Sequence, residues 1–327
     1  MHNNFLSDIL LKAHSQALIL FQKPNNTYQS KQLEVEMVTA LLEGKGISRN
    51  KAILLVLLTA VLWSTSGLFI KIIDLNPFTI AGSRGLIAAV LVLALMNKKL
   101  NFNWSFPQVA GGFCYAGAMI TFVVATVMTT AANAILLQYT MPVFTALFGL
   151  WLLKEKVARF DWGVIFVVVC GMALFFLDEL TFDGLWGNLI AILSAVFFAL
   201  MIIFLRMQKE GSPIETVILG NVITFFICLP FIIQEPPTGA NLLPLSYLGI
   251  FQLGLPFVFY STAIKYITAI DAVLIQTIEP LLNPIWVFLI IGETPGTWAV
   301  IGGAVVLVTV TVRNVYTNRR ATKNAPA

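Results

Sequence analysis

From about residue 52 to residue 315, long apolar segments alternate with short polar connections. Each apolar segment is about 20 residues long, which is the length that an α-helix needs to cross a hydrocarbon core of about 30 Å. The apolar runs are continuous and do not alternate with polar positions, so they predict helices rather than β-strands. The ten predicted spans are residues 52–73, 77–96, 106–127, 130–153, 160–177, 184–205, 213–233, 244–264, 271–292 and 297–315.

The composition agrees with an all-α integral membrane protein. Of the 327 residues, 58% are hydrophobic and only 11% are charged, whereas a soluble domain carries roughly 25% charged residues. The three cysteines lie far apart inside apolar segments, and the two histidines precede the first span. We therefore predict neither a metal site nor a cofactor.

Basic residues gather in alternate connections. They precede the first predicted span and follow every even-numbered one, from Lys45 and Arg49 near the start to Arg319 and Arg320 near the end. Since Lys and Arg favour the cytoplasmic side of a membrane, this pattern predicts an even number of spans with both termini in the cytoplasm. It also explains the net charge of +4 without a nucleic-acid partner.

Residues 1–50 differ from the rest of the chain. The apolar stretch at residues 5–21 is interrupted by Asp8, Lys12 and His14, so it is too short and too charged to span a bilayer. No small-residue cleavage site follows a basic start, so we do not expect a signal peptide. Three interpretations stay open: an interfacial amphipathic helix, a disordered extension, or residues upstream of the true translation start.

An internal repeat relates the fourth and ninth predicted spans. Residues 133–155 align with residues 271–293 without a gap. The aligned positions share polar or helix-breaking side chains, in the pairs Gln138 and Gln276, Pro142 and Pro280, and Glu155 and Glu293. We therefore predict two related halves of five spans, residues 51–180 and 184–316, followed by a basic cytoplasmic tail at 317–327.

A unit of five spans ends on the side of the membrane opposite to its start, so the second half must be inverted relative to the first. The connections agree, because Lys154, Lys156 and Arg159 after the fourth span have no basic counterpart after the ninth. Inverted repeats are the architecture of alternating-access transporters, in which a cavity between the halves opens to either side in turn.

Several short motifs extend over both halves. They are Leu62-Trp63-Ser64 and Phe69-Ile70-Lys71, then Pro77 and Arg84, then Leu152-Leu153-Lys154-Glu155 after Pro142, and finally Gly292-Glu293 after Pro280. In order and spacing these motifs resemble the EamA-type permeases of the drug/metabolite transporter superfamily, over about residues 52–315. The resemblance implies export or exchange of a small metabolite without ATP, in the inner membrane of a bacterium. It does not identify the substrate, because members of the superfamily transport amino acids, nucleobases, sugars or drug-like compounds.

Pro142 and Pro280 interrupt helices at matching positions of the two halves. Proline lacks the N–H that would bond the carbonyl four residues earlier, so the carbonyls of Gln138 and Gln276 lose their helical partner. Matched interruptions are the best pointer in a sequence to a central site. The two prolines are therefore candidate hinges, with helix kinking for better packing as the alternative.

Polar side chains follow one another at helical spacing in the ninth span. Gln276, Glu279 and Asn283 share one face, with Trp286 near its end. Glu279 lies about 10 Å below the membrane surface, where a charge is costly unless it is hydrated, paired or protonated. We predict that this stripe lines the substrate pathway, and that Glu279 carries a coupling proton or binds a cationic substrate group. A structural ion pair with Arg84 is the alternative.

Arg84 in the second span is the other charge deep in the membrane. It is a candidate for binding a substrate carboxylate, or for holding its helix to backbone carbonyls through the close contacts that neighbouring small residues allow. The predicted pathway is completed by Trp63, Ser64, Gln138 and Tyr260, for which ordinary hydrogen bonding between helices is the alternative.

The leading interpretation is a secondary active transporter that exports an amino acid, a nucleobase or a drug-like compound. Its expected partners are the lipid bilayer, a small-molecule substrate and a coupling proton, and a homodimer stays open. The alternatives are a membrane-embedded lipid-modifying enzyme and a membrane subunit without transport activity. An enzyme would need clustered acids, histidines or a nucleophile beside a base, and the spans offer no such cluster. The chain also lacks a phosphate-binding loop for ATP.

Overall fold

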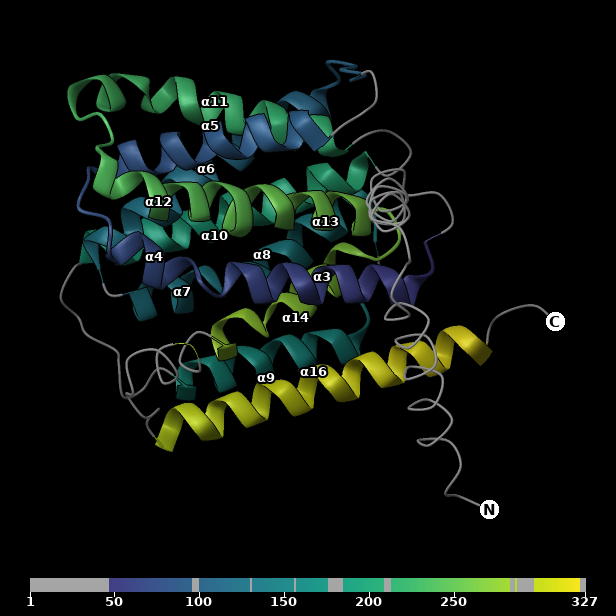
Figure 1. Cartoon of the computed structure of the whole chain (residues 1–327). Coiled ribbons are helices and arrows are strands. Elements are labelled where there is room, and N and C mark those ends of the chain that lie inside the picture. The colour runs from purple at the N-terminus through teal and green to yellow at the C-terminus, as the bar shows by residue number, and fades with distance from the viewer. Residues whose placement is uncertain are drawn as a thin grey trace, which may run out of the picture. The chain divides into compact units, whose positions relative to one another are not determined.

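The structure of the chain, a computed structural model, describes residues 47–95, 100–129, 131–155, 157–175, 185–208, 213–282, 286 and 297–323. Within these ranges every regular element is helical, and the helices form ten segments (Figure 1). The predicted N-terminal extension up to residue 46, Asn283 and most of the second part of the ninth span lie outside the described residues.

Six of the ten segments are single continuous helices. They are α5 (Pro77–Leu95), α6 (Phe106–Met128), α9 (Arg159–Phe175), α10 (Leu185–Met207), α11 (Pro213–Gln234) and α16 (Thr297–Lys323). Their bounds agree with the predicted spans to within a few residues, except at the end of α16. That helix continues beyond residue 315 to Lys323.

The other four segments are not single α-helices, because they contain a turn or a π-helix. The first consists of α3 (Arg49–Trp63) and α4 (Ser66–Lys71), and the fourth of α7 (Ala131–Gln138), α8 (Met141–Phe148) and the π-helix η1 (Gly149–Leu153). The eighth consists of α12 (Gly239–Tyr247), the π-helix η2 (Leu248–Gly254) and α13 (Leu255–Ala263), and the ninth begins with α14 (Ala269–Gln276). The eighth segment starts at residue 239 instead of 244. Apolar composition predicts a span but not a break inside it, because a break leaves the composition unchanged.

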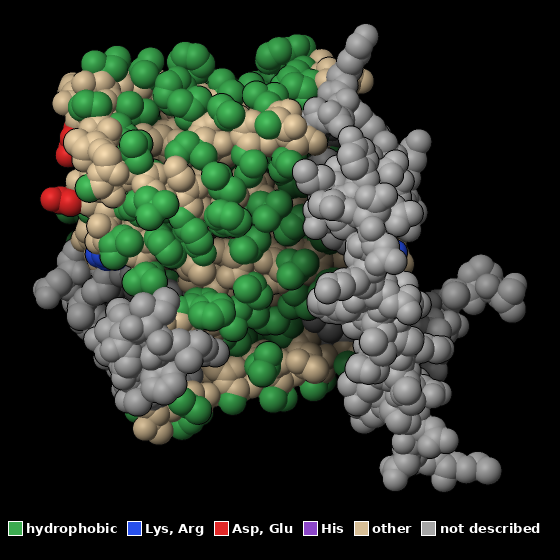
Figure 2. All heavy atoms as spheres, in the orientation of Figure 1, with side chains coloured by type: hydrophobic (Ala, Val, Ile, Leu, Met, Phe, Trp, Pro, Cys, Tyr) green, Lys and Arg blue, Asp and Glu red, His purple; other side chains and the backbone are tan. Residues whose placement is uncertain are grey.

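Six segments of the described chain are long and apolar enough to cross a membrane: Arg49–Lys71, Pro77–Leu95, Phe106–Met128, Leu185–Met207, Pro213–Gln234 and Gly239–Ala263. Apolar side chains are spread over the described surface visible in Figure 2, and the visible charged side chains lie at its margins. Large apolar side chains such as Trp151 and Leu243 are 76% and 81% exposed. A surface of this kind is suited to contact with lipid rather than with water.

Helices from the two halves of the chain pack side by side. α6 lies along α10, α5 lies along α11, α9 lies along α16, and α3 contacts α13 and α14 (Figure 1). Each of these pairs joins one helix from before residue 180 to one from after it. The interior of the bundle is therefore lined by both halves.

Glycines allow some of these helices to approach closely. A Cβ atom added to Gly220 on α11 would lie 2.6 Å from the Cβ atom of Tyr115 on α6, and one added to Gly82 on α5 would lie 2.5 Å from the Cβ atom of Cys228 on α11. Atoms this close to a backbone cannot move aside by a change of rotamer. The backbones of α5, α6 and α11 are thus in contact at positions where only glycine fits.

The substitution Gly220→Ala should therefore push α11 away from α6. Overpacking of this kind costs about 1–3 kcal/mol, so we expect a lower melting temperature for the protein purified in detergent, measured by circular dichroism. Gly163→Ala on α9 is the matched control, because nothing lies within 4 Å of the added Cβ atom. Equal melting temperatures for the two variants would contradict the close packing of α6 and α11.

Candidate functional site

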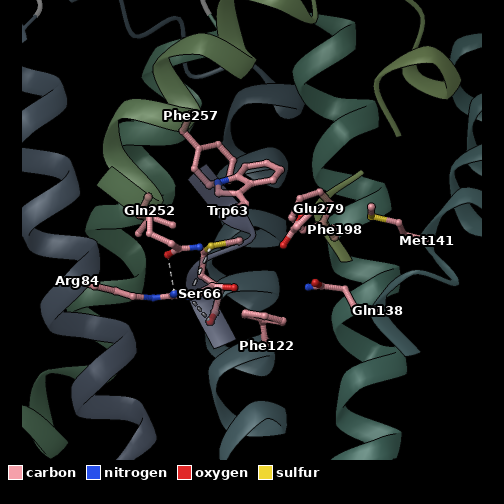
Figure 3. A pocket seen from close by; sticks show the side chains of 12 residues that line it. Trp63, Ser66, Arg84, Phe122, Gln138, Met141, Phe198, Gln252, Phe257 and Glu279 are labelled. Atoms are coloured by element: carbon pink, nitrogen blue, oxygen red, sulfur yellow. Dashed lines mark hydrogen bonds between the residues drawn. The ribbon is translucent and has the colours of Figure 1, made fainter. Parts of the chain in front are cut away.

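A cavity in the interior of the bundle is lined by residues from both halves of the chain. Figure 3 shows Arg84 and Gln252 on one side of this cavity and Glu279 and Gln138 on the other, with the indole of Trp63 between them. We call it the central cavity. It brings together four of the side chains that the sequence predicts for the pathway: Trp63, Arg84, Gln138 and Glu279.

The break in the first segment places Trp63 in an aromatic cluster. α3 ends at Trp63, and the hydroxyl of Ser64 donates to the carbonyl of Val61. The indole ring then lies 5.0 Å from the ring of Phe257 and 5.6 Å from that of Phe198, measured between centroids. Both rings also line the central cavity, so its apolar wall is built from three separate helices.

Three further predicted residues support this wall from outside the cavity. The Tyr260 ring lies 5.6 Å from the indole of Trp63. The indole nitrogen of Trp286 donates to the Ser64 hydroxyl at 2.6 Å, which joins the ninth segment to the break in the first. Ser64, Tyr260 and Trp286 therefore hold Trp63 and its neighbours in position, while Ser66 lines the cavity itself.

Arg84 is completely buried and bonds to neutral groups. Its Nη1 atom donates to Oε1 of Gln252 at 3.1 Å, and its Nη2 atom donates to the carbonyl oxygen of Met119 at 3.3 Å. The Nε–H group is buried without a partner, and so is the hydroxyl of Ser66, which lines the same cavity. A buried guanidinium without a carboxylate partner is unusual. The site therefore has unused donors for an anionic or hydrogen-bond-accepting group.

Glu279 is 8% exposed and lines the same cavity. Its Oε2 atom lies 2.8 Å from the hydroxyl of Tyr139. Arg84 and Glu279 do not form an ion pair, although both line the central cavity, so the structural pairing considered from the sequence is not observed in the described chain. A guanidinium and a carboxyl group thus line one cavity without bonding to each other.

Both predicted proline interruptions coincide with breaks in the described helices. α7 ends at Gln138 and α14 ends at Gln276, and each helix is followed by two residues in a turn before the chain becomes helical again. The Gln138 amide donates to the hydroxyl of Ser194 on α10 at 2.9 Å, which fixes one edge of the cavity. The Gln276 side chain is buried beside Tyr260.

Sequence reasoning missed Gln252 and underestimated Tyr139. Gln252 lies in the π-helix η2, and a single amide in an otherwise apolar segment was the only signal of its role. Tyr139 is visible in the sequence as one of several tyrosines at membrane depth. Its contact with the ninth segment joins residues 140 positions apart, which no local pattern reveals.

Comparison with known proteins identifies the relatives of this chain. The sequence model of the EamA-like transporter family matches residues 50–177 and again residues 185–314. The chain is 27% identical to an uncharacterized transporter of Clostridium kluyveri, over 83% of this chain and 95% of the relative. It is 28% identical to human solute carrier family 35 member G1, over 77% of this chain and 75% of that protein.

A third relative carries a more specific name. The S-adenosylmethionine uptake transporter of Rickettsia prowazekii is 22% identical, over 76% of this chain and 85% of the relative. A solved crystal structure is similar with a TM-score of 0.72 at 20% sequence identity, and the match covers 83% of this chain and 99% of the other. At that identity the structural match shows a shared fold.

Removal of the Trp63 ring should destabilise the cavity wall. Truncation of a buried tryptophan to alanine costs about 3–5 kcal/mol, so Trp63→Ala should lower the melting temperature clearly and Trp63→Phe, which keeps an aromatic ring, should do so less. Trp186→Ala is the control because that side chain is 71% exposed. The role assigned to Trp63 fails if thermal unfolding of Trp63→Ala and Trp186→Ala is indistinguishable.

Proposed function

The chain belongs to the EamA-like transporter family, and we propose that it exports a small organic metabolite by alternating access, coupled to protons and without ATP. It is a multi-pass membrane protein of a transporter family, so the interpretation as a lipid-modifying enzyme is set aside. In this proposal the protein resides in the inner membrane of a bacterium, with both termini in the cytoplasm. The uptake named for the Rickettsia relative makes import the second candidate direction.

The observation that carries the proposal is a central cavity lined by two deep ionisable groups, a guanidinium and a carboxyl group. Arg84 offers guanidinium donors beside the free hydroxyl of Ser66, and Glu279 offers a carboxyl group from the other half of the chain. Deep ionisable groups in membrane proteins usually mark substrate or ion pathways. A substrate bound here would contact both halves, which is the position required for alternating access.

Among the substrate classes considered, an amino acid matches this pair of groups best. Its carboxylate would bind Arg84 and Ser66, and its ammonium group would bind Glu279, while an apolar side chain would contact Trp63 and Phe257. Charge-assisted hydrogen bonds of this kind are the strong ones in a site of low polarity. A proton and the ammonium group would then compete for Glu279, and this competition couples their movements.

One end of the bundle is held together by ion pairs, which supports a closed state at that end. Arg49 on α3 pairs with Asp271 on α14 at 3.2 Å, and Asp271 also pairs with Arg313 on α16. Arg313 in turn pairs with Asp161 on α9 at 3.0 Å. This chain of charges links four helices from both halves at the end predicted to face the cytoplasm.

A further ion pair lies at the same end. Arg206 at the end of α10 pairs with Glu155, which follows η1, at 3.0 Å, and it also donates to the carbonyl groups of Ile264 and Lys265. A pocket near these groups is lined by Thr145, Asp271 and Arg313. In the proposed cycle, release of these pairs opens this pocket to the cytoplasm and joins it to the central cavity.

Transport and its coupling can be tested in proteoliposomes. Amino acids that raise the melting temperature of the purified protein are expected to accumulate against their gradient when a pH gradient is imposed. Glu279→Gln should reduce this accumulation at least tenfold, because the amide cannot release a proton, whereas Asp74→Asn, at an exposed acid, should not. Unchanged pH dependence in Glu279→Gln, or the absence of flux for every amino acid and nucleobase tested, would contradict the proposal.

The ion pairs can be tested by the reactivity of a cysteine in the pocket. In a Cys170→Ser background, which leaves only the buried Cys114 and Cys228, Thr145→Cys should react slowly with a membrane-impermeant maleimide. Addition of Arg49→Gln should raise the rate severalfold, because the link between α3 and α14 is lost. Lys51→Gln, on the same helix and exposed, is the control. Equal rates for the two variants would show that the Arg49 pair does not close this end.

A further inference from the structure

The Tyr139 hydroxyl lies within hydrogen-bonding distance of two acceptors at once. It is 2.7 Å from the backbone carbonyl oxygen of Gln276 and 2.8 Å from Oε2 of Glu279. Tyr139 is 2% exposed and Gln276 is completely buried, so water does not replace either contact. A phenol has a single hydrogen and donates one such bond. Both contacts are hydrogen bonds only if one of the two partners donates to the phenol oxygen.

The chemistry of the partners decides which one donates. The carbonyl oxygen of Gln276 carries no hydrogen, so the donor must be Glu279 in its protonated form. Tyr139 then receives a bond from Glu279 and donates its own hydrogen to Gln276. When Glu279 is ionised it can only accept, and the carboxylate attracts the Tyr139 hydrogen more strongly than a neutral carbonyl does. The Gln276 carbonyl then loses its donor.

The Gln276 carbonyl depends on Tyr139 because of the proline that follows it. Its partner in an uninterrupted helix would be the N–H of residue 280, and Pro280 has none. The next backbone N–H groups, those of Leu281 and Leu282, both bond to the carbonyl of Ile278. A buried carbonyl without a donor is unfavourable, so the state of this one bond affects the stability of the break between α14 and residue 279.

Comparison of the two halves of the chain shows that only one of them has this arrangement. Thr277 occupies the position equivalent to Tyr139, and its hydroxyl bonds within its own helix to the carbonyl of Leu274 at 2.7 Å. Met141 occupies the position equivalent to Glu279. The contact therefore does not follow from the shared architecture of the two halves.

We infer that Tyr139 is a positioning residue that transmits the protonation state of Glu279 to the helix break at Pro280. When Glu279 is protonated, it donates a hydrogen bond to Tyr139, and Tyr139 donates one to the Gln276 carbonyl. These two bonds join the breaks of the fourth and ninth segments. Loss of the proton turns the Tyr139 hydrogen to the carboxylate and releases the Gln276 carbonyl. The inference rests on the proposed proton coupling and adds the element through which the proton acts.

The other groups around Glu279 do not substitute for the hydrogen bond between Glu279 and Tyr139. Across the cavity, α5 contributes the cation Arg84 and η2 contributes the neutral Gln252, to which Arg84 is bonded. The neighbouring wall contributes neutral rings, including Trp63 of α3 and Phe198 of α10. Tyr260 of α13 lies beside the Gln276 side chain. In the described chain, Tyr139 is thus the hydrogen-bonding partner of the Glu279 carboxyl group.

Hydrogen–deuterium exchange of the purified full chain tests the inference without any substrate. After correction for the intrinsic pH dependence of exchange, the amides of residues 277–279, 281 and 282 should lose protection roughly fivefold to tenfold as pH rises and Glu279 loses its proton. In Glu279→Gln the amide N–H still donates to Tyr139, so protection should stay high at every pH. In Tyr139→Phe it should be low at every pH.

Two further variants keep the test decisive if Tyr139→Phe lowers stability generally. Tyr247→Phe removes a phenol hydroxyl on α12, remote from the break, and should keep the pH dependence of the wild type. Pro280→Ala supplies the missing N–H to the Gln276 carbonyl, so Tyr139→Phe combined with Pro280→Ala should regain protection. Wild-type pH dependence in Tyr139→Phe, or no recovery in the double variant, overturns the inference.

The outcome also separates this inference from the proposed function. If transport is coupled to protons and Tyr139→Phe retains the wild-type pH profile of exchange, Tyr139 is not the transmitting residue and the coupling stands. If protection depends on pH as expected and transport does not, the link between Tyr139 and Glu279 stands and the proposed coupling fails.

Discussion

Backbone hydrogen bonding inside the membrane is the constraint on which the rest of the structure depends, because hydrocarbon offers no water to a free carbonyl. The described helices break in the first, fourth and ninth segments. At each break a side-chain hydroxyl group donates a hydrogen bond to a backbone carbonyl. Thr65 donates to Leu62, Thr140 donates to Leu137, and Thr277 donates to Leu274. These local bonds make interruption tolerable, and the interruptions are what leave room for polar side chains in the interior.

The sequence predicts the spans and the two interruptions at proline well, because both depend on local chemistry. Pro142 and Pro280 remove an N–H wherever they are placed in a helix, so their effect on the carbonyls of Gln138 and Gln276 follows from the sequence alone. The depth of Arg84 and Glu279 follows from counting residues along a helix of known rise. The break after Trp63 and the π-helical turn at Gln252 carry no comparable signal, because their residues are compatible with a continuous helix.

The arrangement of the site depends on contacts between distant segments, and sequence reasoning cannot supply these. The bond from Trp286 to Ser64 and the bond from Arg84 to Gln252 each join residues more than 160 positions apart, with separations of 222 and 168. The repeat gives part of this information, since it relates the two broken segments. It also hides the difference between them, because Met141 and Glu279 hold equivalent positions and only one of them can exchange a proton.

The glycine contacts have a consequence for how such a protein can move. Gly82 and Gly220 bring α5, α6 and α11 together at backbone distance, and tightly packed interiors transmit displacement rather than absorb it. These three helices come from both halves of the chain, so we expect them to travel as one rigid body during a transport cycle. The boundary between moving parts would then follow the interrupted helices instead of the border between the two repeats.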